Sequence, residues 1–463
     1  MKSYINQNTI CAISTPAGTG AIAIIRMSGE KSKDIIEKIF IPYNKQPLKH
    51  SYCSVGTISD TNNEIIDEVV VTYFKSPKSY TGEDLIEIAC HGSNYIQQKI
   101  LELLIRVGAY QALPGEFTYR AFKNGKLDLS QAEAVSDLII SENKQAHDIA
   151  VSQLKGNYSS NIKELKDKLL NFASLLELEL DFSDQDVEFA NREQMIELLN
   201  TIEYELKFMI SSFELGNVIR NGIPVAIIGK PNVGKSTLLN ILLNEDKAIV
   251  SNIPGTTRDV IEDTININGF LFRFIDTAGL RDTDNPIETM GIERTIDKIN
   301  NAKIILYLID LSNENENELL NEINDFKAKY AEKPNKHFLL ICNKIDEVDH
   351  LPKWYNQLSS LNPIYISAKR RENIHLIVDK ICSIVKDMEI KNDFVITNVR
   401  HVEAMQKALV SVESAKQSFS DNIPTDLISI DIRDSLYHLS SILGEITTND
   451  ILENIFTNFC IGK

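Results

Sequence analysis

The first quarter of the chain alternates short apolar runs with turns. Residues 1–119 contain AIAIIRMSG (21–29), IIDEVVVTYF (65–74) and IEIACHG (86–92). Apolar runs of this length, bounded by turn residues, are typical of strands. We therefore expect a small α/β or α+β domain in this stretch.

The next hundred residues have a different apolar spacing. Segments 130–156 and 162–182 repeat apolar residues at helical intervals and contain few Gly or Pro. This pattern predicts long amphipathic helices over residues 120–219. Residues 385–463 return to the same pattern, so we expect a second helical stretch at the end of the chain.

Residues 220–384 alternate apolar runs with helical segments. The runs are IPVAIIG (223–229), KIILYLID (303–310), HFLLIC (337–342) and PIYIS (363–367). Such alternation favours a doubly wound, mainly parallel sheet. The prediction is an α/β plus α protein, in which an α/β domain is inserted into a helical domain whose two halves pack together.

Composition narrows the class of protein. The 463 residues are 43% hydrophobic and 24% charged, with a net charge of −17, so RNA binding would need a local basic patch or a partner. No apolar run approaches the roughly 18 residues of a membrane span, and the N-terminus is too polar for a signal peptide. We expect a cytoplasmic protein with no membrane segment. Its scattered cysteines favour neither zinc nor disulfides: Cys11, Cys53, Cys90, Cys342, Cys382 and Cys460.

One glycine-rich loop carries the first chemical signal. Residues 229–236 read GKPNVGKS, between an apolar strand and a predicted helix. This is the P-loop pattern, in which Gly229 and Gly234 let backbone N–H groups face phosphates. Lys235 would reach the β- and γ-phosphates, and Ser236 would bind Mg²⁺.

Three further segments follow in the order expected for a GTPase. Asp276 ends the strand GFLFRFID, which pairs with TININ across Asn268–Gly269, a strong hairpin signal. Asp346, in NKID (343–346), can accept hydrogen bonds from guanine N1–H and the 2-amino group, which adenine lacks. SAK (367–369) would offer a backbone N–H to guanine O6. These segments argue against an ATPase.

The loop SNIPGTTRD (251–259) lies where the first switch would be. Thr257 is the candidate second Mg²⁺ ligand. Arg258 could be an arginine finger, but a solvated or paired arginine is the more common case. The complete set of candidate GTP-binding residues is Asn232, Val233, Gly234, Lys235, Ser236, Thr237, Ser251, Asn252, Ile253, Pro254, Gly255, Thr256, Thr257, Asp276, Thr277, Ala278, Gly279, Asn343, Lys344, Asp346, Ser367, Ala368 and Lys369.

Motifs outside the nucleotide segments point to one family. SYTGEDLIEIACHG (79–92), LPGEFTYRAFKNGKLDLSQAEAV (113–135) and the terminal CIGK (460–463), together with the inserted GTPase segments, resemble the MnmE (TrmE) family of tRNA-modification GTPases. The resemblance covers the whole chain. It implies a folate-binding and dimerisation domain over 1–119, helical halves over 120–219 and 385–463, and a GTPase domain over 220–384.

The resemblance also addresses a missing catalytic group. Ras-like enzymes orient the attacking water with a glutamine after DTAG, but here that position is Leu280. The family is described as activated by K⁺, which stands in for an arginine finger, and its catalytic glutamate matches Glu288. Without the resemblance, Glu288 would be an ordinary residue of a helix's first turn. The matching K⁺ ligands are Asn232, Ser251, Ile253 and Thr256.

A one-carbon folate site is implied by the same resemblance. The family binds 5-formyl-tetrahydrofolate or a related folate, and the matching residues are Arg26, Glu87, Lys126 and Lys463. Viewed alone, each would be a surface charge. Phe459 and Ile461 suggest that the C-terminal tail is docked, and Cys460 is either a nucleophile or a small buried hydrophobe.

The function implied is a K⁺-activated GTP hydrolase acting as a homodimer. With the FAD-dependent MnmG (GidA) family protein, as a heterotetramer, it would add an aminomethyl-type group to C5 of the wobble uridine of certain tRNAs. The alternative is a regulatory GTPase switch in ribosome assembly without modification chemistry. Folate binding by residues 1–119 would separate the two.

Overall fold

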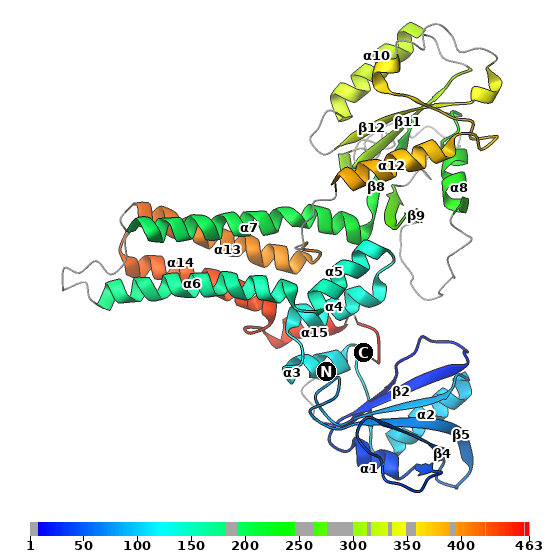
Figure 1. Cartoon of the computed structure of the whole chain (residues 1–463), viewed down its shortest axis with the longest axis vertical. Coiled ribbons are helices and arrows are strands. Elements are labelled where there is room, and N and C mark those ends of the chain that lie inside the picture. Colours follow the sequence, from blue (N-terminus) through cyan, green and yellow to red (C-terminus); the bar gives the residue numbers. More distant parts are fainter. Residues whose placement is uncertain are drawn as a thin grey trace. The chain divides into compact units, whose positions relative to one another are not determined.

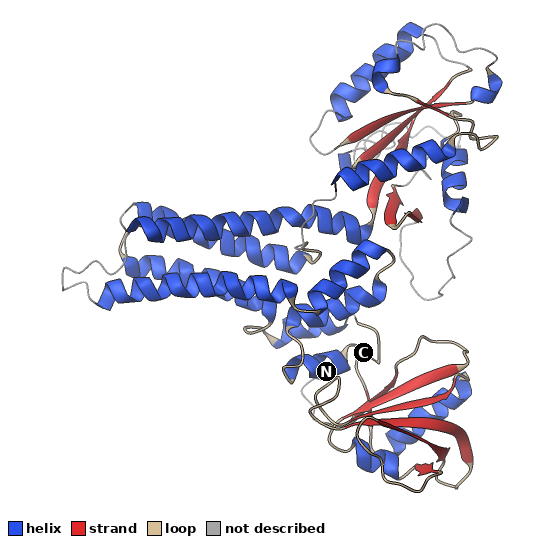
Figure 2. Cartoon of the chain, viewed as in Figure 1, coloured by secondary structure: helices blue, strands red, loops and turns tan. Residues whose placement is uncertain are grey.

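The chain divides into two compact units. The computed structural model describes residues 8–181, 192–245, 263–275, 300–312, 316–331, 336–348, 358–388, 395–421, 423–457 and 459–462. Internal contacts group Met1–Ile140, Ala150–Lys207 and Glu403–Lys463 in the first unit, and Ser141–Ile149 with Phe208–Val402 in the second. Each unit contains one sheet (Figure 2).

The first sheet confirms the strands predicted near the N-terminus. Its order is β3-β4-β5-β6-β2-β1-β7, antiparallel throughout except for the β1–β7 pair. Helix α2 packs on this sheet (Figure 1), with buried Ile100 and Leu104 in one cluster with Ile25 and Ile88. The elements are β1 (Ile10–Ile13), β2 (Ile22–Ser28), α1 (Ser32–Glu37), β3 (Phe40–Pro42), β4 (Tyr52–Ser59), β5 (Ile65–Phe74), β6 (Leu85–His91), α2 (Asn94–Val107) and β7 (Tyr110–Gln111).

Long helices follow, as their apolar spacing predicted. The expected helical run 130–156 is two helices, because Asn143 begins a new one by accepting a hydrogen bond from Ala146 N at 2.8 Å. Helix α6 packs against α14, and the rings of Phe172 in α6 and Phe419 in α13 lie 6.2 Å apart. The helices before and after the second sheet's segment of the chain therefore pack together. The elements are α3 (Glu116–Lys123), α4 (Leu129–Ile140), α5 (Lys144–Leu154), α6 (Asn157–Asp181), α7 (Arg192–Asn221), α13 (Val399–Ser420), α14 (Thr425–Leu443) and α15 (Asn449–Thr457). None of the described helices is long and apolar enough to cross a membrane.

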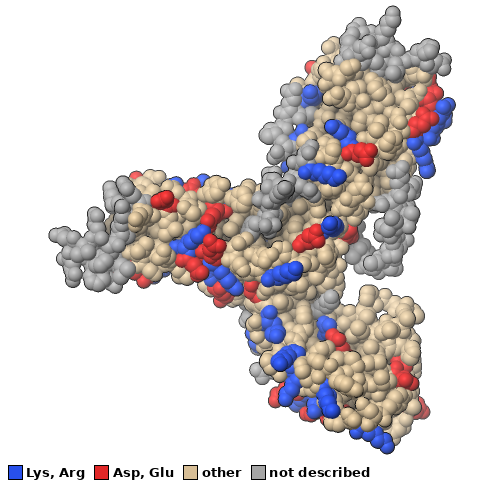
Figure 3. All heavy atoms as spheres, in the orientation of Figure 1, with Lys and Arg blue, Asp and Glu red and all other residues tan. Residues whose placement is uncertain are grey.

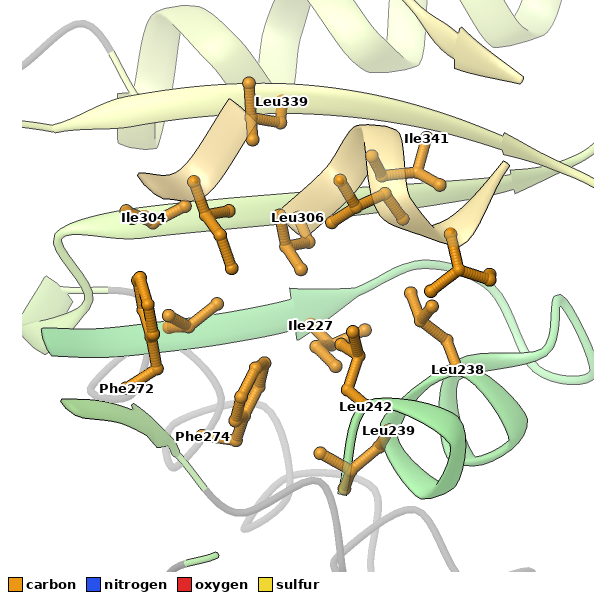
Figure 4. Packing of buried hydrophobic residues seen from close by; sticks show 14 of the residues in the cluster. Ile227, Leu238, Leu239, Leu242, Phe272, Phe274, Ile304, Leu306, Leu339 and Ile341 are labelled. Carbon is orange, nitrogen blue, oxygen red and sulfur yellow. The ribbon is translucent and has the colours of Figure 1, made fainter. Parts of the chain in front are cut away.

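The second sheet is doubly wound and mainly parallel, as predicted. Its order is β13-β12-β11-β8-β10-β9, and of its pairs only β9–β10 is antiparallel. Apolar residues fill the space between the sheet and α8 (Figure 4), including Leu238, Leu242 and Leu306. The elements are β8 (Ile223–Ile228), α8 (Lys235–Glu245), β9 (Asp263–Ile267), β10 (Phe270–Phe274), β11 (Ile304–Asp310), α10 (Glu316–Phe326), η2 (Lys327–Ala331), β12 (His337–Asn343), η3 (Ile345–Glu347), η4 (Ser359–Leu361), β13 (Ile364–Tyr365) and α12 (Ile374–Met388).

The predicted hairpin lies, in sequence, between segments 251–259 and 276–279. Asn268 and Gly269 both have positive φ, 53° and 87°, as a type I′ turn requires, and Ile267 faces Phe270 across it. The segment before α5 packs on this hairpin and its surroundings. Asn266 donates to the Glu142 carbonyl at 2.9 Å, and Asn143 donates to the Ile219 carbonyl at 3.1 Å. These contacts place residues 141–149 in the second unit.

Candidate functional site

The P-loop connects β8 to α8 with a backbone that most side chains could not adopt. Gly229 and Gly234 have φ of 154° and 100°, and Asn232, between them, has φ of 64°. A Cβ on Gly229 would lie 2.2 Å from the Leu308 carbonyl oxygen, and one on Gly234 would lie 2.3 Å from Nδ2 of Asn343. The loop is therefore held close to the carboxyl ends of β11 and β12.

Lys235 is folded back over this loop. Its ammonium donates to the carbonyl oxygens of Gly229 at 2.8 Å and Lys230 at 2.6 Å, and the residue is buried. Val233 is buried beneath the loop, whereas Ser236 and Thr237 at the start of α8 are exposed. The hydroxyl groups therefore face outward, where a phosphate or Mg²⁺ would bind.

Asn343 joins the P-loop to the SAK loop. Its Nδ2 donates to the Val233 carbonyl at 2.7 Å, and its Oδ1 accepts from the Ala368 N–H at 2.9 Å. Asn343 is buried, with 2% of its surface exposed, so both bonds are shielded from water. The arrangement fixes the P-loop relative to the segments that contain Asn343 and Ala368.

Asp346 carries an acceptor that needs a partner. Its side chain is 4% exposed, and its Oδ1 is buried without a hydrogen-bond partner among the described residues. A hydrogen bond from Ser367 holds the pKa of Asp346 below its ordinary value, so this group is a carboxylate at neutral pH. Because buried polar atoms are normally hydrogen-bonded, this oxygen fits the donors of a guanine base.

Lys344 is fixed by an acid that the sequence analysis did not select. It forms an ion pair with Asp310 at the end of β11, and this hydrogen bond raises the pKa of Lys344. Burial alone would raise the pKa of Asp310, but the hydrogen bonds from Lys344 and Ser312 outweigh burial and lower it. The acid at the end of the run KIILYLID was the available signal.

Several predicted site residues lie outside the described residues. These are Ser251, Asn252, Ile253, Pro254, Gly255, Thr256, Thr257, Asp276, Thr277, Ala278, Gly279, Glu288 and Lys463. Of the candidate metal ligands, the structure describes Ser236 and Asn232, and both are exposed on the P-loop side of α8.

In the first unit the structure pairs two of the predicted folate residues. Arg26 and Glu87 face each other on β2 and β6, and Nη2 of Arg26 lies 2.6 Å from Oε1 of Glu87. The guanidinium is 5.5 Å from the ring centroid of Tyr80 and 5.9 Å from that of Phe117. Both Arg26 hydrogen bonds end at Oε1, and no described residue donates to Oε2. Lys126 lies on an exposed turn after α3 and donates to the Pro77 carbonyl at 3.2 Å; no described contact joins it to Arg26 or Glu87.

Sequence reasoning missed the ion cluster that supports this region. Arg120 is bound by Glu83 at 2.9 Å and Glu116 at 2.8 Å, and Ser28 donates to Glu83 at 2.9 Å. The cluster joins the SYTGED segment to α3 and β2. The available signal was Glu83 in the motif at 79–92 and Glu116 in the motif at 113–135. On the neighbouring strand β6, Nδ1 of His91 lies 2.7 Å from Oδ1 of Asp67.

The C-terminal tail is docked, as predicted. Phe459 is buried in a cluster with Phe456, Cys460 accepts from the Gly115 N–H at 3.3 Å, and Gly462 accepts from the Ser14 hydroxyl at 3.0 Å. Ile461 differs from expectation, because 52% of its surface is exposed; the backbone bonds and Phe459 hold the tail instead. Cys460 is an exposed free thiol rather than a buried hydrophobe.

Comparisons with known proteins cover both units. The family model for the MnmE helical domain matches residues 129–460, and the one for the GTP-binding protein TrmE N-terminus matches residues 9–126. A solved structure of Aquifex aeolicus Era bound to GDP.AlF4- is 27% identical, covers 40% of this chain and 65% of its own, and has a TM-score of 0.28.

Curated relatives match almost end to end. The tRNA modification GTPase MnmE of Flavobacterium johnsoniae is 49% identical over 99% of this chain and 100% of its own length. The protein of the same name from Cytophaga hutchinsonii is 47% identical over 98% of both chains. With its helical and N-terminal parts and nearly its whole length matched, the chain belongs to the MnmE family.

Proposed function

We propose that this protein is a tRNA modification GTPase that binds GTP in the second unit. The observation that carries the proposal is the buried, unpartnered Oδ1 of Asp346, held beside a P-loop to which Asn343 is hydrogen-bonded. A carboxylate there is satisfied by guanine N1–H and the 2-amino group and would remain unsatisfied beside adenine. Membership of the MnmE family makes the same assignment from sequence: the protein is a GTP hydrolase.

The residues of the P-loop have separate roles in this reaction. Lys235 exchanges its carbonyl partners for the β- and γ-phosphates, and the backbone N–H groups from Asn232 to Thr237 line the anion. Ser236 and Thr257 would hold Mg²⁺, which would neutralise charge on the phosphates, and Asp276 would also hold the ion. Thr277, Ala278 and Gly279, which follow Asp276 in the sequence, would contact the γ-phosphate.

K⁺ would supply the charge that other GTPases take from an arginine finger. We assign it to Asn232 in the P-loop together with Ser251, Ile253 and Thr256. Glu288 orients the attacking water, because the aliphatic Leu280 has no hydrogen-bonding group with which to do so. The position of Asn232 supports this assignment, since its amide is exposed at the bend between the two P-loop glycines.

The first unit binds a tetrahydrofolate that donates one carbon. The unengaged Oε2 of Glu87 suits the donors of a pterin ring, while Arg26, Lys126 and Lys463 suit its carbonyl and carboxylate oxygens. The rings of Tyr80 and Phe117 hold Arg26 over this surface. The four functional regions are then 1–119 for folate and dimerisation, 120–219 and 385–463 for the helical halves, and 220–384 for GTP.

The product is a tRNA carrying an aminomethyl or carboxymethylaminomethyl group at C5 of the wobble uridine. The protein acts as a homodimer in the cytoplasm with an FAD-dependent MnmG-family protein, as a heterotetramer. GTP hydrolysis drives a conformational cycle and transfers no phosphate to RNA.

Profiling of wobble uridines in a deletion strain tests this function. Wobble-uridine modification should be lost in the deletion strain and restored when the wild-type gene is supplied. The alternative, a ribosome-assembly switch, predicts unchanged uridines and no folate binding by the protein. Calorimetry with 5-formyl-tetrahydrofolate on the purified chain separates the two proposals independently of the strain.

A further inference from the structure

Four lysines gather at one end of the first unit in a protein whose net charge is −17. Lys75 and Lys78 belong to the loop between β5 and β6, and Lys123 and Lys126 lie at and just beyond the end of α3. All four are exposed. Lys and Arg side chains also gather over the region of α3 in the space-filling view (Figure 3). We name these four residues the lysine patch.

Packing of the β5–β6 loop against the end of α3 holds the patch together. Nζ of Lys126 donates to the carbonyl of Pro77, between the other two loop positions of the patch. Asn124 donates to the Thr81 carbonyl at 2.7 Å, and a Cβ on Gly82 would lie 3.0 Å from Cβ of Asn124. The end of α3, with Lys123 and Lys126, is therefore packed beside the loop that carries Lys75 and Lys78.

The patch has no acidic counterpart of its own. No ion pair joins any of its lysines to a carboxylate among the residues described. The nearby acids have other partners: Glu83 and Glu116 bind Arg120, Asp84 accepts from the Ser76 N–H at 2.8 Å, and Asp128 accepts from Ser130 at 2.7 Å. The fully exposed charged residues of segments 75–84 and 116–128 are all lysines.

We propose that the lysine patch binds the phosphate backbone of the substrate tRNA. This inference rests on the proposed function, because it names the surface through which that substrate is held. Mobile lysines on an exposed surface contact phosphates without reading bases, and an otherwise acidic protein needs such a local patch to attract RNA. Lys126 belongs both to the patch and to the proposed folate site, so the RNA is held at the side of the first unit that carries that site.

The test uses full-length protein and a fluorescent anticodon stem-loop. The variant Lys75→Ala/Lys78→Ala/Lys123→Ala leaves Lys126 intact for folate. The matched control, Lys155→Ala/Lys163→Ala/Lys407→Ala, removes three other exposed lysines of the same unit. Anisotropy titrations from 25 to 200 mM KCl then give the affinity and its salt dependence.

The patch variant should bind RNA at least about tenfold more weakly at low salt. The magnitude of the slope of log K against log[salt] should fall by about 2–3, because each of the three lost phosphate contacts contributes roughly 0.7–0.9 to that slope. The loss should be equal for the stem-loop and for an unrelated hairpin, because phosphate contacts carry no sequence information. The control should behave like wild type. Folate affinity should be unchanged in both variants.

Three results would overturn the inference: wild-type protein that binds no RNA at low salt, equal slopes for patch variant and control, or loss of folate affinity in place of RNA affinity. Complementation keeps this separate from the proposed function. If wild type fails to restore wobble modification, the function is wrong; if wild type restores it and the patch variant binds RNA normally, only the surface is wrong.

Discussion

The amide of Asn343 donates to the carbonyl oxygen of Val233 at 2.7 Å, so a residue of the proposed base-recognition segment supports the P-loop directly. The same side chain accepts from Ala368. One buried amide therefore connects three parts of the nucleotide site that lie far apart in sequence.

Replacing this amide should weaken nucleotide binding as a whole. Asn343→Ala leaves a buried carbonyl and a buried N–H without partners, at about 1–3 kcal/mol each, so GDP affinity should fall by at least about tenfold. Asn343→Asp keeps the acceptor for the Ala368 N–H but loses the donor to the Val233 carbonyl. Its GDP affinity should therefore lie between those of wild type and Asn343→Ala. Wild-type GDP affinity in the alanine variant, measured by calorimetry, would contradict this role.

GTP hydrolysis should depend on the monovalent cation. Exchanging Na⁺ for K⁺ at constant ionic strength should raise the rate at least about tenfold, a part of the roughly 10³–10⁵ that an arginine finger supplies. Asn232 has positive φ, so Asn232→Gly is a better test than alanine because it removes the amide without backbone strain. That variant should bind GDP normally and lose the K⁺ response; equal wild-type rates in the two salts would rule out the ion.

Base preference should follow the carboxylate of Asp346. Asp346→Asn supplies an amide donor, which suits the 2-oxo group of xanthine and not the 2-amino group of guanine. The variant should therefore prefer xanthosine nucleotides, as measured by competition binding. Ser367→Ala is the companion variant, since it leaves the carboxylate in place and should keep the preference for GTP.

Removal of the C-terminal CIGK should separate the two activities. The tail is held by Gly115 and Ser14 in the first unit, so its loss should spare GTP hydrolysis and abolish tRNA modification. The thermal shift given by 5-formyl-tetrahydrofolate should largely vanish. Lys463→Ala alone should weaken folate binding by about 1.5–3 kcal/mol if it makes one charge-assisted hydrogen bond, while Cys460→Ser should leave that binding intact. A truncated chain that still binds folate and modifies tRNA would remove Lys463 from the site.

The GTPase region should become less stable at acidic pH because Asp310 becomes protonated. Its pKa is lowered in the folded state, so the ionised form contributes stability above the unfolded pKa of about 3.9, and this contribution is lost as pH falls through the folded pKa. The difference in unfolding free energy between wild type and Asp310→Asn should be constant from pH 5 to 8 and shrink below about pH 4. The chain's single tryptophan, Trp354, lies in this region of the sequence and reports urea unfolding by fluorescence. A difference that grows in acid would contradict the assignment.

Local signals predicted the elements that local chemistry determines. The Asn268–Gly269 turn requires two positive φ values, and the P-loop requires glycines where a Cβ would collide, so both were visible in the sequence. The break before α5 was not, because Asn143 is an unremarkable residue within a helical pattern until its side chain caps a helix.

Long-range pairings were the part that the sequence concealed. Arg26 and Glu87 are separated by 61 positions, and only the register of β2 with β6 makes them partners. Arg120 and Glu83 are separated by 37 positions, and Asn343 and Val233 by 110. Such contacts depend on strand order, which apolar spacing does not encode.

Residues 141–149 have a consequence for the modularity of this protein. Residues 150–207 separate them from the rest of the second unit in sequence, yet the side chain of Asn266 donates to the Glu142 carbonyl and that of Asn143 donates to the Ile219 carbonyl. A fragment excised at the insertion points would lack a strip of its own surface and leave those groups to solvent. The smallest self-contained GTPase module of this chain is thus discontinuous, and any transplant or truncation of it must carry a piece of the preceding helical segment.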